Sequence, residues 1–187
     1  MGIIHSPQDI QNSLQEWFEK NGRHWIPWKL KQDGSIPQSG ESISPYEIWI
    51  AEVMLQQTQL KVAIPYWKKW MRVFPTLTCL AKTDLDNILM IWQGLGYYSR
   101  ANRIHQASKI LCKFVGKNRD QDPHAWPTKI DQWTSLPGIG RSTAGGIISS
   151  AFDLPTPILD GNVKRIFSRL LASEKTPQKN EKKLWEF

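Results

Sequence analysis

Helical signals follow one another along the whole chain, and this constrains the fold more than any other feature. Apolar residues recur at helical spacing, and proline or glycine separates one segment from the next. No segment alternates with the β-branched enrichment of a strand, so the sequence predicts an all-α protein. Helices are expected at about 7–21, 46–58, 60–74, 85–92, 99–114, 130–136, 142–151 and 162–172, with a further one over 181–187.

Composition restricts the partners and the compartment. The 187 residues carry a formal charge of +7, which favours a polyanionic partner. Hydrophobic residues make up 40% of the chain, enough for a packed core, yet no apolar run reaches the length of a membrane span. Cys79 and Cys112 form no zinc or disulfide pattern, so we expect a reduced compartment, with the bacterial cytoplasm as the default location.

A carboxylic acid lies inside the most apolar helical segment. Glu52 is flanked at helical spacing by Ile48, Trp49 and Leu55, so burial should raise its pKa and suit it to act as a general acid. A partly exposed glutamate, or one paired with a core arginine, is the alternative. The amides and hydroxyl of Gln56, Gln57 and Thr58 suit DNA contacts, although from this segment alone a solvated helix end is the better explanation.

A glycine-rich turn joins the segments at 130–136 and 142–151. Gly138 and Gly140 permit close approach of the backbone, and the following helix offers free N–H groups and a positive dipole end to a phosphate. Ile139 should anchor the turn in the core. The spacing is that of the helix-hairpin-helix DNA-binding motif, with an ordinary pair of packed helices as the alternative.

A second carboxylate, Asp160, precedes the segment at 162–172. It can cap that helix, or it can be an ionised group in the same cleft as Glu52. A neutral and a charged carboxyl together form a pattern for cleaving a glycosidic bond. Lys164, Arg165 and Arg169 would favour the DNA backbone.

Five blocks of sequence together resemble the adenine DNA glycosylases of the MutY family, within the helix-hairpin-helix DNA glycosylase superfamily. They are Ile26-Pro27-Trp28, Ala51 to Gln59, Gly94 to Tyr98, Leu136 to Gly145, and Ile158 to Arg165. The resemblance implies a helix-hairpin-helix glycosylase fold. It also implies a monomer that flips adenine out of double-stranded DNA and removes it where it is mispaired with guanine or 8-oxoguanine.

The resemblance also assigns roles. Glu52 would protonate adenine at N7, and Asp160 would stabilise the cationic sugar and assist the attacking water. Ser142 stands where lyases of the superfamily carry a Schiff-base lysine, which favours a monofunctional glycosylase. Arg23 and Trp28 would line the base pocket. Gln56 and Tyr97 would insert into the base stack, and the other expected DNA contacts are Gln57, Thr58, Gly138, Gly140, Ser142, Thr143, Lys164 and Arg165.

The chain departs from the family in two places. Residues 29–44, read as a flexible loop, are longer than in most members. The chain also ends before the four-cysteine loop that holds a [4Fe–4S] cluster in the family, so no cluster ligands are expected here. We therefore predict a six-helix module over 45–151. An N-terminal helix (1–28) and a C-terminal part (152–187) would form an incomplete second domain with exposed apolar surface.

Two other functions remain open at this stage. One is a bifunctional glycosylase and lyase of the endonuclease III type, which Ser142 argues against because serine cannot form an imine. The other is an inactive, truncated DNA-binding fragment. The intact pair Glu52 and Asp160 argues against decay of the site, whereas the missing cluster region argues for a fragment.

Overall fold

The computed structural model describes residues 6–116 and 119–186, and every regular element in this part is helical. The outermost ends of the expected segments 1–28 and 152–187 lie outside the described residues. The helices are α1 (Pro7–Asn21), α2 (Pro45–Leu55), α3 (Leu60–Val73), α4 (Leu77–Lys82), α5 (Leu85–Trp92), α6 (Ser99–Val115), α7 (Ile130–Thr134), α8 (Arg141–Phe152), α9 (Gly161–Leu170) and α10 (Glu181–Glu186), with 3-10 turns η1 (Pro27–Lys29) and η2 (Pro123–Ala125). The all-α prediction is confirmed.

The sequence missed one helix. α4 has only six residues, which are too few to show helical periodicity. It lies between Pro75 and Asp84, the N-cap of α5. Its start is nevertheless marked by a polar residue, because the hydroxyl of Thr76 accepts the backbone N–H of Cys79 at 3.1 Å. A helix this short can be recognised in a sequence only by its capping residue.

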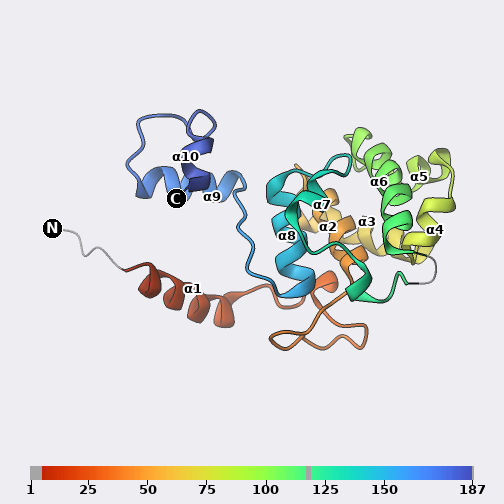
Figure 1. Cartoon of the computed structure of the whole chain (residues 1–187), viewed down its shortest axis with the longest axis horizontal. Helices are drawn as coiled ribbons and strands as arrows, with labels where there is room; N and C mark the ends of the chain where they lie inside the picture. The colour runs from red at the N-terminus through yellow and green to blue at the C-terminus, as the bar shows by residue number, and fades with distance from the viewer. Residues whose placement is uncertain (1–5, 117–118, 187) are drawn as a thin grey trace.

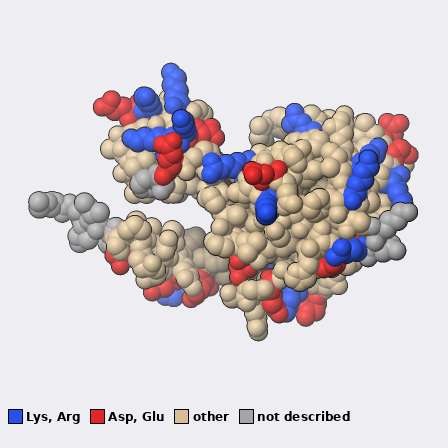
Figure 2. All heavy atoms as spheres, viewed as in Figure 1, with Lys and Arg blue, Asp and Glu red and all other residues tan. Residues whose placement is uncertain are grey.

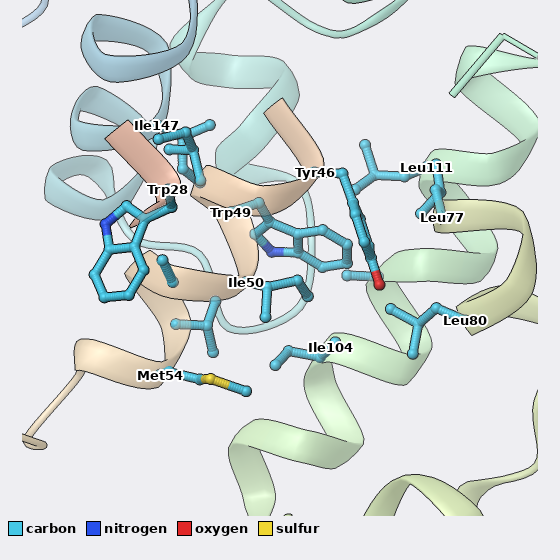
Figure 3. Close-up of a cluster of buried hydrophobic side chains, with 14 of the residues drawn as sticks. Trp28, Tyr46, Trp49, Ile50, Met54, Leu77, Leu80, Ile104, Leu111 and Ile147 are labelled. Atoms are coloured by element: carbon cyan, nitrogen blue, oxygen red, sulfur yellow. The ribbon is translucent and has the colours of Figure 1, made fainter. Parts of the chain in front are cut away.

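Helix α2 lies at the centre of a module that contains α2 to α8. It contacts α3, α6, α8 and η1, while α4 and α5 pack against α6 (Figure 1). Eight of its eleven residues are buried, so the helix is enclosed on nearly all sides. Trp49, Ile50 and Met54 pack there with side chains from α4, α6 and α8, as Figure 3 shows. This arrangement confirms the prediction of a buried apolar helix.

The segments from the two chain ends stand apart from this module. Figure 1 shows α1 as a separate arm and α9 with α10 as a small unit, both on the same side of the module. No described residue of α1 or α9 is buried. Large apolar side chains are exposed on both helices, as expected: Ile10, Leu14, Trp17 and Phe18 on α1, and Ile166 and Leu170 on α9.

The segment between η1 and α2 has irregular structure but is fastened at several points. The N–H of Gly40 donates to the carboxylate of Asp153 at 2.8 Å, and Ile43 donates its N–H to the carbonyl of Ala151 at 3.0 Å. An ion pair joins Lys31 to Glu41 at 3.1 Å. These contacts place residues 39–43 beside the end of α8, and the predicted flexibility of the segment stays a prediction.

A buried arginine terminates α2. The guanidinium of Arg100, on α6, donates through Nη1 to the carbonyls of Val53, Met54 and Gln56, and to the hydroxyl of Thr58. Through Nη2 it donates to the carbonyls of residues 95 and 96. The prediction that this helix extends to residue 58 is therefore wrong by three residues. The carbonyls that would continue the helix bond to Arg100, and residue 57 is left-handed.

Replacing Arg100 with methionine should destabilise the protein by about 3 kcal/mol, because buried carbonyls at the end of α2 lose their donor. Urea unfolding would measure the change. Lys109→Met, an exposed change on the same helix, serves as the matched control and should cost less than about 0.5 kcal/mol. If the Arg100 variant lost no more free energy of unfolding than the control, the role of Arg100 at the end of α2 would be contradicted.

Candidate active site

Both predicted carboxylates line one pocket. A cavity of about 480 Å³ opens between the end of α2, one face of α8 and the segment before α9. Glu52 belongs to α2, and Asp160 is the residue just before α9. The other lining residues are Lys29, Leu55, Gln56, Ser142, Thr143, Gly146, Ser149, Ser150 and Ile158. The structure thus brings together two groups that lie 108 positions apart in the sequence.

Glu52 has the environment of a carboxylic acid held neutral. Burial raises its pKa to about 7; Lys29 lowers the pKa and Asp160 raises it, each to a lesser extent. No ion pair in the described part includes Glu52, so a core arginine does not partner it. Gly146 of α8 leaves room for the carboxyl, since a Cβ there would lie 2.9 Å from Oε2 of Glu52. Burial thus shifts the pKa in the direction that the sequence analysis predicts.

Asp160 has the opposite environment. It is exposed, and one of its carboxylate oxygens accepts the N–H groups of Asn162 at 2.9 Å and Val163 at 2.8 Å. It therefore caps α9 and lines the pocket at the same time, so the two interpretations of this residue are compatible. Exposure and two backbone donors give Asp160 a polar environment, whereas the Glu52 carboxyl is desolvated.

The glycine-rich turn lies beside the pocket. Gly138 has a φ of 82°, a conformation that favours glycine, and Ile139 is 5% exposed, as expected for an anchor. The amide of Gln56 donates to the carbonyl of Gly138 and to the hydroxyl of Thr143, both at 3.3 Å. These two hydrogen bonds link the end of α2, the helix that carries Glu52, to the hairpin.

Two exposed side chains, one just after α2 and one just before α6, lie on strained backbone. Gln57 and Tyr97 have positive φ angles of 59° and 48°, which residues with side chains rarely adopt. Arg100 joins their two loops through the carbonyls of Gln56 and Gly96, and its guanidinium lies 5.4 Å from the Tyr97 ring centroid. Sequence reasoning missed Arg100, because nothing in the sequence pattern distinguishes it from Arg103, the exposed arginine on the same helix.

The structure separates the two residues predicted for the base pocket. Trp28 is 3% exposed and packs on Trp67 with ring centroids 5.4 Å apart, and it does not line the cavity. Arg23 lines a neighbouring cavity of about 300 Å³, which shares Lys29, Ser149 and Ser150 with the first. Lys29 is the pocket cation that the sequence analysis missed, since a lone lysine after a tryptophan carries no signal.

The predicted basic residues of α9 are partly engaged within the protein. Lys164 forms an ion pair with Glu181 of α10 at 2.9 Å, and Arg165 donates to the side chain of Asn162 at 2.6 Å. Arg141, at the start of α8, lies over the ring of Trp185 at 4.0 Å from its centroid. Figure 2 shows lysine and arginine side chains on the α9–α10 unit, interspersed with aspartate and glutamate side chains.

A [4Fe–4S] cluster does not fit the side chains of this chain. Such a cluster is held by four cysteine thiolates, and the chain has two cysteines, Cys79 and Cys112. Both are free, and no group of three or more metal-ligating side chains gathers anywhere in the part of the chain that the structure describes. No helix among residues 6–116 and 119–186 has the length and apolarity to cross a membrane.

Comparison with curated proteins finds several adenine DNA glycosylases. That of Buchnera aphidicola subsp. Baizongia pistaciae is 40% identical over 175 residues, which is 93% of this chain and 44% of the relative. That of Homo sapiens is 34% identical over 178 residues, 94% of this chain and 31% of the relative. The chain thus spans less than half the length of these relatives.

Comparison with solved structures finds DNA glycosylases of the same architecture. A complex of endonuclease III with DNA superposes with a TM-score of 0.67 at 21% identity, covering 98% of this chain and 78% of that one. A thermostable thymine-DNA glycosylase superposes with a TM-score of 0.68 at 18% identity, covering 86% of this chain and 66% of that one. Residues 50–187 match the family described as HhH-GPD superfamily base excision DNA repair protein. The chain, with its paired carboxylates beside a glycine-rich hairpin, therefore belongs to the HhH-GPD superfamily of base excision DNA repair proteins.

Proposed function

We propose that this chain carries the chemistry of an adenine DNA glycosylase. It would hydrolyse the N-glycosidic bond of adenine mispaired with guanine or 8-oxoguanine in double-stranded DNA. The observation that carries the proposal is the pairing, in one pocket, of Glu52 with a pKa of about 7 and an exposed Asp160. The names of the curated relatives support adenine as the base.

The reaction divides between the two carboxyls. With adenine turned out of the duplex into the pocket, protonated Glu52 donates its proton to N7. The C1′–N9 bond then breaks, its electron pair goes to the base, and the sugar becomes an oxocarbenium ion. Ionised Asp160 stabilises this cation and orients a water, which attacks C1′ and passes a proton to the Asp160 carboxylate. Exchange with solvent then returns both carboxyls to their starting protonation states. The products are free adenine and an abasic sugar.

The side chains of the pocket favour hydrolysis without strand cleavage. Ser142 lines the pocket at the position where lyases carry lysine, and a hydroxyl forms no imine with the sugar. The amine of Lys164 is engaged in an ion pair with Glu181, so it is not free to attack the sugar. Lys29 is the remaining amine at the pocket among the described residues, and it acts electrostatically on Glu52. A bifunctional enzyme is therefore the less favoured alternative.

DNA would bind over the hairpin and the strained loops. The hairpin presents the N-terminus of α8 to a phosphate. Gln56 is held by the hairpin, so we assign insertion into the base stack to the exposed pair Gln57 and Tyr97 instead. The chain would act as a monomer, and in a bacterial cell it would meet its substrate in the cytoplasm, at the nucleoid.

Glu52→Gln should abolish excision of adenine from a duplex with adenine opposite 8-oxoguanine, because the amide cannot donate the proton. Single-turnover assays should show wild-type activity that falls as the pH rises through about 7, since Glu52 then loses its proton. Strands should break only after alkali, as expected without an imine.

Glu52→Asp and an A·T duplex are the controls for this assay. The shorter acid keeps the proton and should retain more activity than the amide. Wild-type protein should leave the A·T duplex intact. Activity that rises with pH above 7, or full activity in Glu52→Gln, would refute the assignment of Glu52 as the acid.

The two neighbouring glutamines provide a matched test of DNA insertion. Gln57→Ala should weaken excision by about tenfold, because an inserted side chain stabilises the flipped state by about 1 kcal/mol or more. It should leave thermal stability unchanged, since the side chain is exposed. Gln56→Ala should instead lower the melting temperature, because it removes the link between α2 and the hairpin. The reverse pattern would assign insertion to Gln56.

A further inference from the structure

The segment that carries Asp160 has no regular structure of its own. It leaves α8 at Asp153, which is left-handed with a φ of 52°, and continues irregularly to the start of α9. Figure 1 shows this connection running back beside α8. The position of Asp160 in the pocket is therefore set by whatever fastens the segment to α8.

Gly145 fixes the first half of this connection. The hydroxyl of Thr156 donates to the carbonyl of Gly145 at 3.0 Å. The backbone then passes so close that a Cβ on Gly145 would lie 2.4 Å from the carbonyl oxygen of Pro157. Only glycine permits this approach, because the obstacle is rigid backbone and not a movable side chain.

Ser142 fixes the second half, one residue before the carboxylate. Its Oγ accepts the backbone N–H of Leu159 at 2.9 Å, across 17 positions of sequence. Leu159 is 3% exposed, so its N–H would lose its acceptor in a buried place if the hydroxyl were removed. The carboxylate of Asp160 next bonds to the first N–H groups of α9. Ser142 and the cap of α9 thus hold the backbone on both sides of this carboxylate.

We propose that Ser142 is a positioning residue, whose hydroxyl holds the Leu159 backbone so that the Asp160 carboxylate faces Glu52 across the pocket. The role in catalysis rests on the proposed glycosylase function, whereas the anchoring itself does not. Serine at this position then has two consequences. It removes the amine that a lyase needs, and it supplies the acceptor that places the second carboxylate.

The anchoring is tested first without any activity, by amide hydrogen exchange of the Leu159 N–H followed by NMR. Ser142→Ala should speed this exchange by about tenfold, the loss of one net hydrogen bond, while Ser142→Thr retains the oxygen and should keep the protection. Ser135→Ala is the matched control, because that hydroxyl donates to Gln132 within its own turn. Unchanged exchange at Leu159 in Ser142→Ala would overturn the proposal whether or not the chain is a glycosylase.

The catalytic consequence is tested by single-turnover excision at saturating enzyme. Ser142→Ala should slow the chemical step by about tenfold or more, because small displacements of a catalytic group are costly. Thr156→Val, which removes the other anchor outside the pocket, should slow it too, and Ser142→Thr should restore the rate. Ser135→Ala should match the wild type. Rates for Ser142→Ala and Thr156→Val equal to the wild type, with exchange at Leu159 accelerated, would show that the anchor does not serve catalysis and would overturn that part of the proposal.

Discussion

Enclosure of α2 on nearly all sides is the constraint on which the rest of the site depends. A helix surrounded by α3, α6, α8 and η1 cannot present Glu52 fully to water, so its carboxyl is desolvated and its pKa rises to about 7. Such a residue opposes folding when ionised. Relative to an ordinary value of 4.5, the shift costs up to roughly 3 kcal/mol as the pH rises through the interval between the two values. The tryptophan-rich core around α2 offsets this cost, and the protein keeps a neutral acid near physiological pH.

Arg100 connects this core to the surface that would meet DNA. One buried guanidinium holds the end of α2 and the loop before α6, and these carry the two exposed residues with left-handed backbone, Gln57 and Tyr97. Gln56 continues the connection from α2 to the hairpin. Hydrogen bonds therefore connect the helix that carries the acid, the strained loops and the hairpin. A base turned out of the duplex would enter a pocket whose acid is already in place.

The features predictable from the sequence are those with a local signature. Glu52 was identifiable because its helical neighbours are apolar, and the hairpin because one residue separates its two glycines. Arg100, Lys29 and the burial of Trp28 depend on contacts between distant segments, which leave no periodic trace. The proposed division of roles between Gln56 and Gln57 likewise rests on the hydrogen bonds of Gln56 to the hairpin, which side-chain chemistry alone does not reveal.

Direct titration of Glu52 tests the central claim. The protein would be labelled with ¹³C at the glutamate side-chain carboxyl carbons, and the NMR shift of each carbon followed against pH, with Glu52→Gln identifying the signal that disappears. The account predicts that this signal titrates near pH 7, because burial disfavours its charged form. Titration at the ordinary value near 4.5 would show that Glu52 is ionised at neutral pH and would contradict its assignment as the general acid.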